Sequence, residues 1–148
     1  MMDHATNFLS AIRRIMKLHE GILKGICEEY KLTLMEGTII SFLYHNPERD
    51  TAADIVEYRM LSKGNVSQAV ESLIQKSLLQ RRRDTGDRRR IHLSLTSSSL
   101  PVTKSIEKSW KKFRAQIFSG ISEEEMEMFE RINSRIMENA QKAGAEKL

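Results

Sequence analysis

The chain has 148 residues, of which 40% are hydrophobic and 30% charged, with 24 Lys+Arg against 20 Asp+Glu. This composition predicts one globular domain with a hydrophobic core, and no apolar run approaches the length of a membrane span, which excludes a transmembrane helix. The single cysteine cannot form an internal disulfide, so we expect a reducing, cytoplasmic location.

The first predicted helix covers residues 5–30. Its apolar stripe is wider than packing on one neighbour requires. The pattern alone favours two interpretations equally: the stripe is shared between two subunits, or the helix is buried in its own monomer. The stripe consists of Phe8, Leu9, Ile12, Ile15, Met16, His19, Ile22, Leu23, Ile26 and Tyr30.

Three short helices are predicted next. Thr33 and Glu36 have capping-box spacing, and the helix that they start should end near Pro47, because the residue before proline avoids helical angles. A second helix should begin at Thr51, and its two alanines suit the close crossing of a helix-turn-helix. A third should begin after Ser62, a suitable N-cap, and end at about residue 77.

After residue 79, the spacing of the apolar residues changes from helical to alternating. Ile91, Leu93 and Leu95 are expected to point to the core, and the residues between them to solvent. The turn cluster Asp84-Thr85-Gly86-Asp87 precedes them. Together these features predict two strands joined by a turn.

Two more helices should follow the strands. A helix capped by Thr96 would place Pro101 where it removes a backbone hydrogen bond, so either the helix begins with Pro101 or it kinks there. A break is expected at residues 119–120, and Ser122 and Glu125 form another capping box.

The predicted hairpin concentrates the positive charge. Residues 81–92 hold six arginines and two aspartates, an excess of four that equals the excess of the whole chain. Charges this close repel one another, and an anionic partner such as nucleic acid relieves the repulsion. The alternative is a solvated turn or an edge strand protected by arginine. The uncharged polar face of the preceding helix suits base edges and favours nucleic acid.

The segment from Ala53 to Thr96 resembles the winged helix-turn-helix of the MarR (multiple antibiotic resistance regulator) family. The matching features are the helix SKGNVSQAVESLIQ, the following KSLLQRRRD, and the wing GDRRRIHLSLT. The resemblance implies a mainly α fold with a small β-hairpin wing. It also implies a single domain over residues 1–148, with a DNA-binding lobe at 33–96 and dimerisation helices at 5–30 and 100–142.

The third short helix carries side chains suited to DNA. Asn65 and Gln68 have amides that can pair with adenine. Ser67 and Lys63 suit phosphate or sugar, and Gly64 allows close backbone approach. The alternative for the two amides is a solvated helix face.

The resemblance assigns the wing residues. It implies that Arg89 reaches the minor groove and that Asp87 orients it by a charge-assisted hydrogen bond. Flanking arginines are then expected to contact phosphate. The full predicted DNA-binding set is Ser62, Lys63, Gly64, Asn65, Ser67, Gln68, Arg81, Arg83, Asp87, Arg88, Arg89 and Arg90.

The sequence alone predicts no effector site, and neither a cofactor nor a metal is expected. The four histidines have neither i, i+4 spacing nor a Cys-x-x-Cys companion, and Cys27 is interpreted as a buried, inert thiol. The resemblance implies that a small aromatic anion can bind between the dimer helices and the winged lobe. Met16, Met35, Trp110 and Phe113 could line such a cavity, and core packing explains them equally well.

The predicted function is therefore a homodimeric transcription regulator. It would bind double-stranded DNA at a pseudo-palindromic operator, with half-sites about one helical turn apart, as a repressor relieved by a small-molecule effector. The alternative is an effector-independent architectural or constitutive DNA-binding protein. Because no phosphate loop or nucleophile–base motif is found, an enzyme is not expected.

Overall fold

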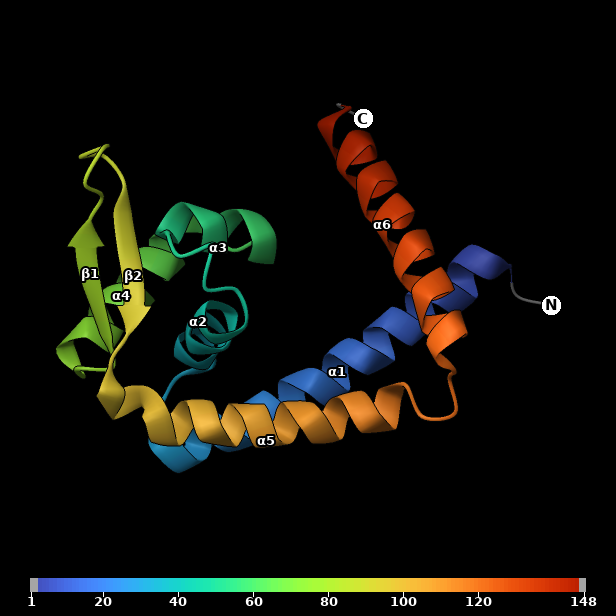
Figure 1. The fold of residues 1–148 in the computed structure, drawn as a ribbon, viewed down its shortest axis with the longest axis horizontal. Helices are drawn as coiled ribbons and strands as arrows, with labels where there is room; N and C mark the ends of the chain where they lie inside the picture. Colours follow the sequence, from blue (N-terminus) through green and yellow to red (C-terminus); the bar gives the residue numbers. More distant parts are fainter. Residues whose placement is uncertain (1–2, 147–148) are drawn as a thin grey trace. The chain divides into compact units, whose positions relative to one another are not determined.

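A computed structural model describes residues 3–146. The chain divides into two compact units, Met1–Phe113 and Arg114–Leu148. Six α-helices and a two-stranded antiparallel sheet are present in the described part of the chain (Figure 1). The prediction of a mainly α fold with a small hairpin is confirmed.

Helix α1 (His4–Tyr30) is confirmed within one residue of its predicted start. Asp3 caps it, with Oδ1 accepting from the Thr6 N–H at 2.7 Å, and Lys31 ends it in the left-handed conformation. Its buried residues, Leu23, Ile26 and Cys27, all lie in the second half of the helix. The first half exposes the large apolar residues Phe8, Leu9, Ile12, Ile15, Met16 and Leu18.

Helices α2 (Leu34–His45), α3 (Ala52–Arg59) and α4 (Lys63–Gln75) begin at the predicted caps. Thr33 forms the expected capping box with Glu36, Thr51 forms another with Asp54, and Ser62 accepts from the Asn65 N–H. These bonds satisfy backbone groups left open by the first helical turn. The three helix starts are therefore determined by short-range interactions.

The core of the first unit lies where these three helices meet α1 and α5 (Leu100–Ile117). Its fully buried members include Ile39, Ile40, Ile55, Val66 and Leu73. Each such side chain contributes about 1.5–3 kcal/mol by leaving water. This packing fixes α4 by one face and leaves its opposite face exposed.

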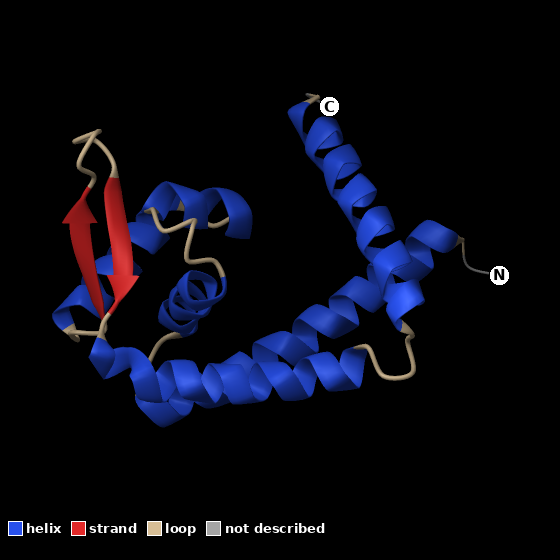
Figure 2. Ribbon diagram, in the orientation of Figure 1, coloured by secondary structure: helices blue, strands red, loops and turns tan. Residues whose placement is uncertain are grey.

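Strands β1 (Leu79–Arg83) and β2 (Ile91–Leu95) form the predicted hairpin (Figure 2). Leu79 pairs with Leu95 at the base, and Leu93 is buried as expected. The expectation that Ile91 faces the core is wrong: it is 38% exposed, because it lies at the tip end of the hairpin beyond the core. The expectation that His92 faces solvent is also wrong, since its side chain is only 16% exposed.

The base of the hairpin is bonded to the end of α4. The Thr96 N–H donates to the Leu78 carbonyl at 3.1 Å, and Thr96 Oγ1 donates to the Ser77 carbonyl at 2.6 Å. The Leu78 N–H in turn donates to the Leu73 carbonyl of α4 at 3.0 Å. These bonds join α4 and the hairpin through a segment of only a few residues.

A 3₁₀ turn, Ser97–Ser99, follows Thr96, and α5 begins at Leu100. Pro101 is thus the second residue of α5, where its missing N–H breaks no helical bond. Of the two alternatives, the later helix start agrees with the structure within one residue, and α5 runs from Leu100 to Ile117.

The second unit contains the end of α5 and helix α6 (Glu123–Ala145). Gly120 takes a φ of 78° in the predicted break, and Ser122 and Glu125 form the predicted capping box. No described residue of α6 is buried. Within residues 3–146, no helix is both long and apolar enough to cross a membrane.

Candidate nucleic-acid interface

The predicted DNA-contacting residues of α4 are all exposed. Val66, Ala69, Val70 and Leu73 hold the helix on the core, so the remaining face is open to a partner. The exposed residues are Ser62, Lys63, Gly64, Asn65, Ser67 and Gln68. Asn65 and Gln68 also line one groove of about 440 Å³ with the start of α2. The structure therefore brings the two predicted adenine-reading amides together.

A buried carboxylate fixes the orientation of α4. Glu36 is 2% exposed, and both of its oxygens lie 2.9 Å from Lys76 Nζ. Ser72 Oγ donates to Oε2 at 3.0 Å, and the Thr33 N–H donates to Oε1 at 2.9 Å. Burial alone would raise the pKa of Glu36, but the bonds from Thr33, Lys76 and Ser72 hold that pKa below its ordinary value. The charged carboxylate thus links the start of α2 to the end of α4.

Sequence reasoning predicted only the capping role of Glu36. Its bonds to Ser72 and Lys76 span 36 and 40 residues, so no local pattern reveals them. The capping-box position of Glu36 was the only feature in the sequence that drew attention to this residue.

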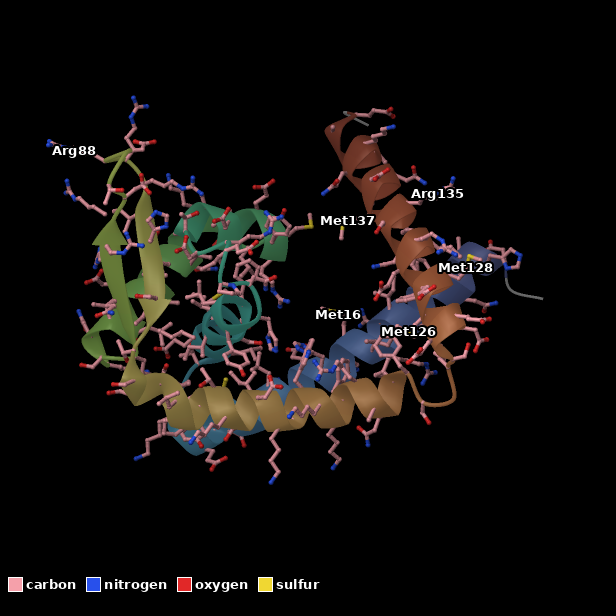
Figure 3. All side chains as sticks on the ribbon, in the orientation of Figure 1. Met16, Arg88, Met126, Met128, Arg135 and Met137 are labelled. Carbon is pink, nitrogen blue, oxygen red and sulfur yellow. The ribbon has the colours of Figure 1, made fainter. Side chains whose placement is uncertain are left out.

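The arginine tip, residues 84–90, closes the hairpin. Asp84 Oδ2 accepts from the backbone N–H groups of Gly86 at 2.9 Å and Asp87 at 2.8 Å. The Arg90 N–H donates to the Asp87 carbonyl at 3.0 Å. Arg88 extends outward from this turn (Figure 3). The tip is a defined turn that presents Arg88, Arg89 and Arg90 to solvent.

Asp87 interacts with Arg89 in an unexpected way. Asp87 Oδ1 accepts from the backbone N–H of Arg89 at 3.0 Å. This bond to the main chain shapes the turn. The bond expected from the sequence would instead join the Asp87 carboxylate to the Arg89 guanidinium and orient it. Asp87 positions Arg89 through the main chain.

The arginines of β1 differ in their surroundings. Arg83 is exposed near the tip, and its contact with phosphate stays a prediction. Arg81, by contrast, forms an ion pair with Glu71 of α4. This pair connects β1 to the exposed side of α4.

His92, Asp50 and Asp84 are polar residues near the tip that sequence reasoning did not select. His92 Nδ1 lies 2.7 Å from Asp50 Oδ1, and Nε2 lies 2.7 Å from Asp84 Oδ1. The alternating pattern placed His92 on the solvent face, and Asp50 is 42 residues away. Only the folded chain brings these groups together.

A cavity of about 250 Å³ lies within the first unit, among α1, α2, α3 and α5. Trp110 and His45 line it, with ring centroids 4.6 Å apart. His45 Nε2 and Arg59 Nε are buried there without a hydrogen-bond partner among the described residues. Burial, with the nearby charges of Arg59 and His45, lowers the pKa of His19. The cavity is aromatic, with two open polar groups.

Three other residues were predicted to line the same cavity as Trp110, and none of them lines this one. Met16 and Met35 line a neighbouring cavity of about 340 Å³, and Phe113 is buried against Trp110. Cys27 is buried, and its burial raises the thiol pKa, which disfavours the reactive thiolate.

Comparison with known proteins agrees with this architecture. A model of the MarR family matches residues 30–90. The transcriptional regulator ZitR of Lactococcus lactis subsp. cremoris (strain MG1363) is 32% identical over 105 residues, which cover 70% of this chain and 71% of ZitR.

Solved structures share the fold. S. aureus MepR in a DNA-binding conformation superposes with a TM-score of 0.78 at 22% identity, covering 90% of this chain and 98% of MepR. A MepR–DNA complex superposes with a TM-score of 0.67 at 20% identity, covering 94% and 99%. With its winged helix-turn-helix and its similarity to ZitR, the chain belongs to the MarR family of DNA-binding transcriptional regulators.

Proposed function

We propose that the chain is a homodimeric repressor that binds a pseudo-palindromic operator in double-stranded DNA and is released by a small-molecule effector. The observation that carries the proposal is the pairing of an exposed amide face on α4 with an arginine tip on the adjoining hairpin. Uncharged amides read base edges, whereas clustered arginines bind phosphate and narrow grooves. The two surfaces together suit sequence-specific DNA binding.

In the proposed complex, α4 enters the major groove and the hairpin reaches an adjacent minor groove. Asn65 and Gln68 pair with adenine, and Arg89 enters the minor groove. Phosphate or sugar contacts come from the start of α4 and from the remaining arginines. These contacts involve Ser62, Lys63, Gly64, Ser67, Arg83, Arg88 and Arg90, with Arg81 and Asp87 supporting the wing.

A second copy of the chain is proposed to cover the exposed apolar residues at both ends. Leu9 of α1 is 63% exposed, and α6 exposes a stripe along much of its length. That stripe consists of Phe129, Ile132 and Ile136, and the exposed Met128 and Met137 flank it on opposite sides of the helix (Figure 3). Single exposed apolar residues are ordinary, but a continuous helical stripe indicates a partner surface.

The cavity lined by Trp110 is the proposed effector site. Its aromatic rings suit a small planar ligand, and the open Nε of Arg59 can donate to an anionic group. The ligand class is therefore a small aromatic anion. Occupying a cavity among α1, α2, α3 and α5 would change how the lobe that carries α4 is held.

Selection of bound sequences from a random DNA pool at moderate salt tests the DNA-binding proposal. Enrichment of a palindrome with two half-sites supports a dimeric, sequence-specific regulator. Tight binding without enrichment would favour the architectural alternative, because phosphate binding carries no sequence information. No binding to DNA would contradict the proposal itself.

Titration with small aromatic carboxylates, starting with benzoate, tests the effector proposal. The ligand should release the wild-type protein from the selected duplex, and Arg59→Gln should raise the ligand concentration required. Lys24→Gln, which removes an exposed cation from α1, serves as the matched control. Operator binding that no member of the series changes would favour the constitutive alternative.

A further inference from the structure

His92 joins the hairpin tip to the body of the winged lobe. One ring nitrogen meets Asp50, in the loop before α3, and the other meets Asp84, in the tip, both at 2.7 Å. The side chain is only 16% exposed, although it lies on a two-stranded hairpin. The ring therefore bridges two segments that are separate in the sequence.

Both ring nitrogens face carboxylate oxygens. Only the cationic imidazole has two N–H donors, whereas the neutral ring would turn a lone pair toward one of the carboxylates. The bonds to Asp50 and then Asp84 raise the pKa of His92 above its ordinary value of 6.5. The bond from His92, followed by those from Asp87 and Gly86, holds the pKa of Asp84 below its ordinary value. Geometry and charge thus both favour an imidazolium between two carboxylates.

Both aspartates make a second hydrogen bond besides the one to His92. The Asp50 carbonyl accepts from the Leu93 N–H at 2.8 Å, and Asp50 directly precedes the α3 cap Thr51. Asp84 uses its other oxygen to close the turn that carries the tip arginines. Movement of His92 would consequently be passed to the tip.

Other charged groups surround the bridge. Arg82 is the residue opposite His92 on β1 and is exposed, so solvent screens its repulsion. In the loop and helix next to Asp50, the Asp54 carboxylate is bonded through Oδ2 by Thr51. Asp50 and Asp84 are the carboxylates bonded to the ring.

We propose that His92 is a positioning residue for DNA binding: its cationic ring holds the arginine tip to the body of the lobe and releases it on losing its proton. The inference rests on the proposed DNA-binding function. Under this proposal, the position of the hairpin tip depends on whether the His92 ring carries its second proton.

The direction of the pH dependence follows from the two shifts. The His92 contribution is fully present below its ordinary pKa of 6.5 and is lost as pH rises through the raised value. The Asp84 contribution is present above its ordinary 3.8 and is lost only as pH falls through the lowered value. DNA affinity should therefore fall as pH rises above 6.5 and through the raised pKa of His92.

The test measures fluorescence anisotropy of the full-length protein with a short duplex carrying the selected palindrome, at constant ionic strength. Between about pH 6 and about pH 9, where histidine titrates, the wild-type affinity should fall by about tenfold. His92→Gln should bind weakly across the whole range and lack the pH-dependent step. The glutamine amide is neutral, so it cannot restore two charge-assisted bonds.

Two further variants complete the test. Asp50→Asn removes one of the two carboxylates that bond to His92, and Asp50 is not among the predicted DNA contacts. The pH step should therefore move to lower pH. If His92→Gln does not fold, this variant tests the inference in its place. Glu48→Gln removes a carboxylate two residues away in the same loop and should retain the wild-type profile. Equal profiles for wild type and His92→Gln would overturn the inference while leaving DNA binding intact. Failure of the wild type to bind the duplex at any pH would overturn both.

Discussion

At the scale of single residues, Arg89 is the side chain on which the proposed minor-groove contact depends. Arg89→Ala should weaken binding to the selected duplex by about 1–3 kcal/mol and reduce the salt dependence of binding, because a cation is lost from the interface. The thermal midpoint should stay unchanged, since Arg89 is exposed and its backbone bond to Asp87 remains. Anisotropy titrations at several salt concentrations measure both effects.

Arg114→Ala provides the comparison for Arg89. It removes an exposed arginine from α5, outside the wing, and should leave DNA affinity near that of the wild type. Equal losses in the two variants would show a general charge effect and contradict the wing assignment.

Replacing Lys76 measures how much its ion pair with the buried Glu36 carboxylate stabilises the fold. Lys76→Met should lower the free energy of unfolding by about 1–2 kcal/mol at neutral pH, less than for a fully buried pair, because Lys76 is 40% exposed. The glutamate pKa is lowered on folding, so its contribution is present above the ordinary 4.5 and is lost as pH falls through the folded value. Urea unfolding at neutral and acidic pH should show the difference shrinking in acid.

Lys112→Met is the matched change for Lys76, since it removes an exposed lysine from α5. Its stability should match that of the wild type at both pH values. A loss in Lys76→Met that persisted undiminished in acid would argue that the ion pair is not its cause.

The sequence predicted which residues of α4 and the tip are exposed, because helical spacing and charge runs are local properties. It did not predict the His92 bridge, because strand alternation assigns a side chain to a face without knowing what covers that face. Asp50 comes from a loop before α3, and only the fold places it against β2. Long-range partners of polar residues were the part of the site that local patterns could not supply.

At the scale of elements, α1 and α2 approach closely at a glycine. A Cβ on Gly37 would lie far inside van der Waals contact with Cys27 Sγ, which is buried. Gly37→Ala should therefore lower the free energy of unfolding by about 1–3 kcal/mol through overpacking. Thermal and urea unfolding of the purified variant measure this loss.

A second change separates crowding from other effects at Gly37. Combining Gly37→Ala with Cys27→Ala removes the sulfur and should recover most of the stability lost in the single variant. Gly25→Ala, where an added Cβ meets nothing within 4 Å, should not destabilise the protein. Additive losses in the double variant would mean that the two helices do not meet at this point.

Element boundaries were predicted well where a cap determines them. Thr33, Thr51, Ser62 and Ser122 each accept a backbone bond within three residues, so the sequence contains the whole interaction. The start of α5 was left between two alternatives, because a 3₁₀ turn intervenes before Pro101. Ser99, the last residue of that turn, is buried, so the turn packs against the core before α5 begins at Leu100.

At the scale of the whole molecule, the proposed dimer should depend on the apolar stripe of α6. Ile132→Glu should raise the dimer dissociation constant by at least about a hundredfold, because a carboxylate would be buried without a partner. Light scattering after size-exclusion chromatography measures the mass, and circular dichroism checks that the helices persist. Weaker operator binding should accompany the loss of the dimer.

Ser134→Glu places the same charge two residues further along α6, about 200° around the helix from Ile132 and on the face opposite the stripe. It should remain dimeric. If both variants stayed dimeric, the interface would lie elsewhere; if both became monomeric, added charge alone would explain the result.

The bonds from Thr96 to Ser77 and Leu78 have a consequence for operator architecture. They hold the base of the hairpin against the end of α4, so the two groove contacts proposed for one copy should keep a constant offset. Each half-site then has a fixed length. A base pair inserted within a half-site should therefore abolish one of its two groove contacts.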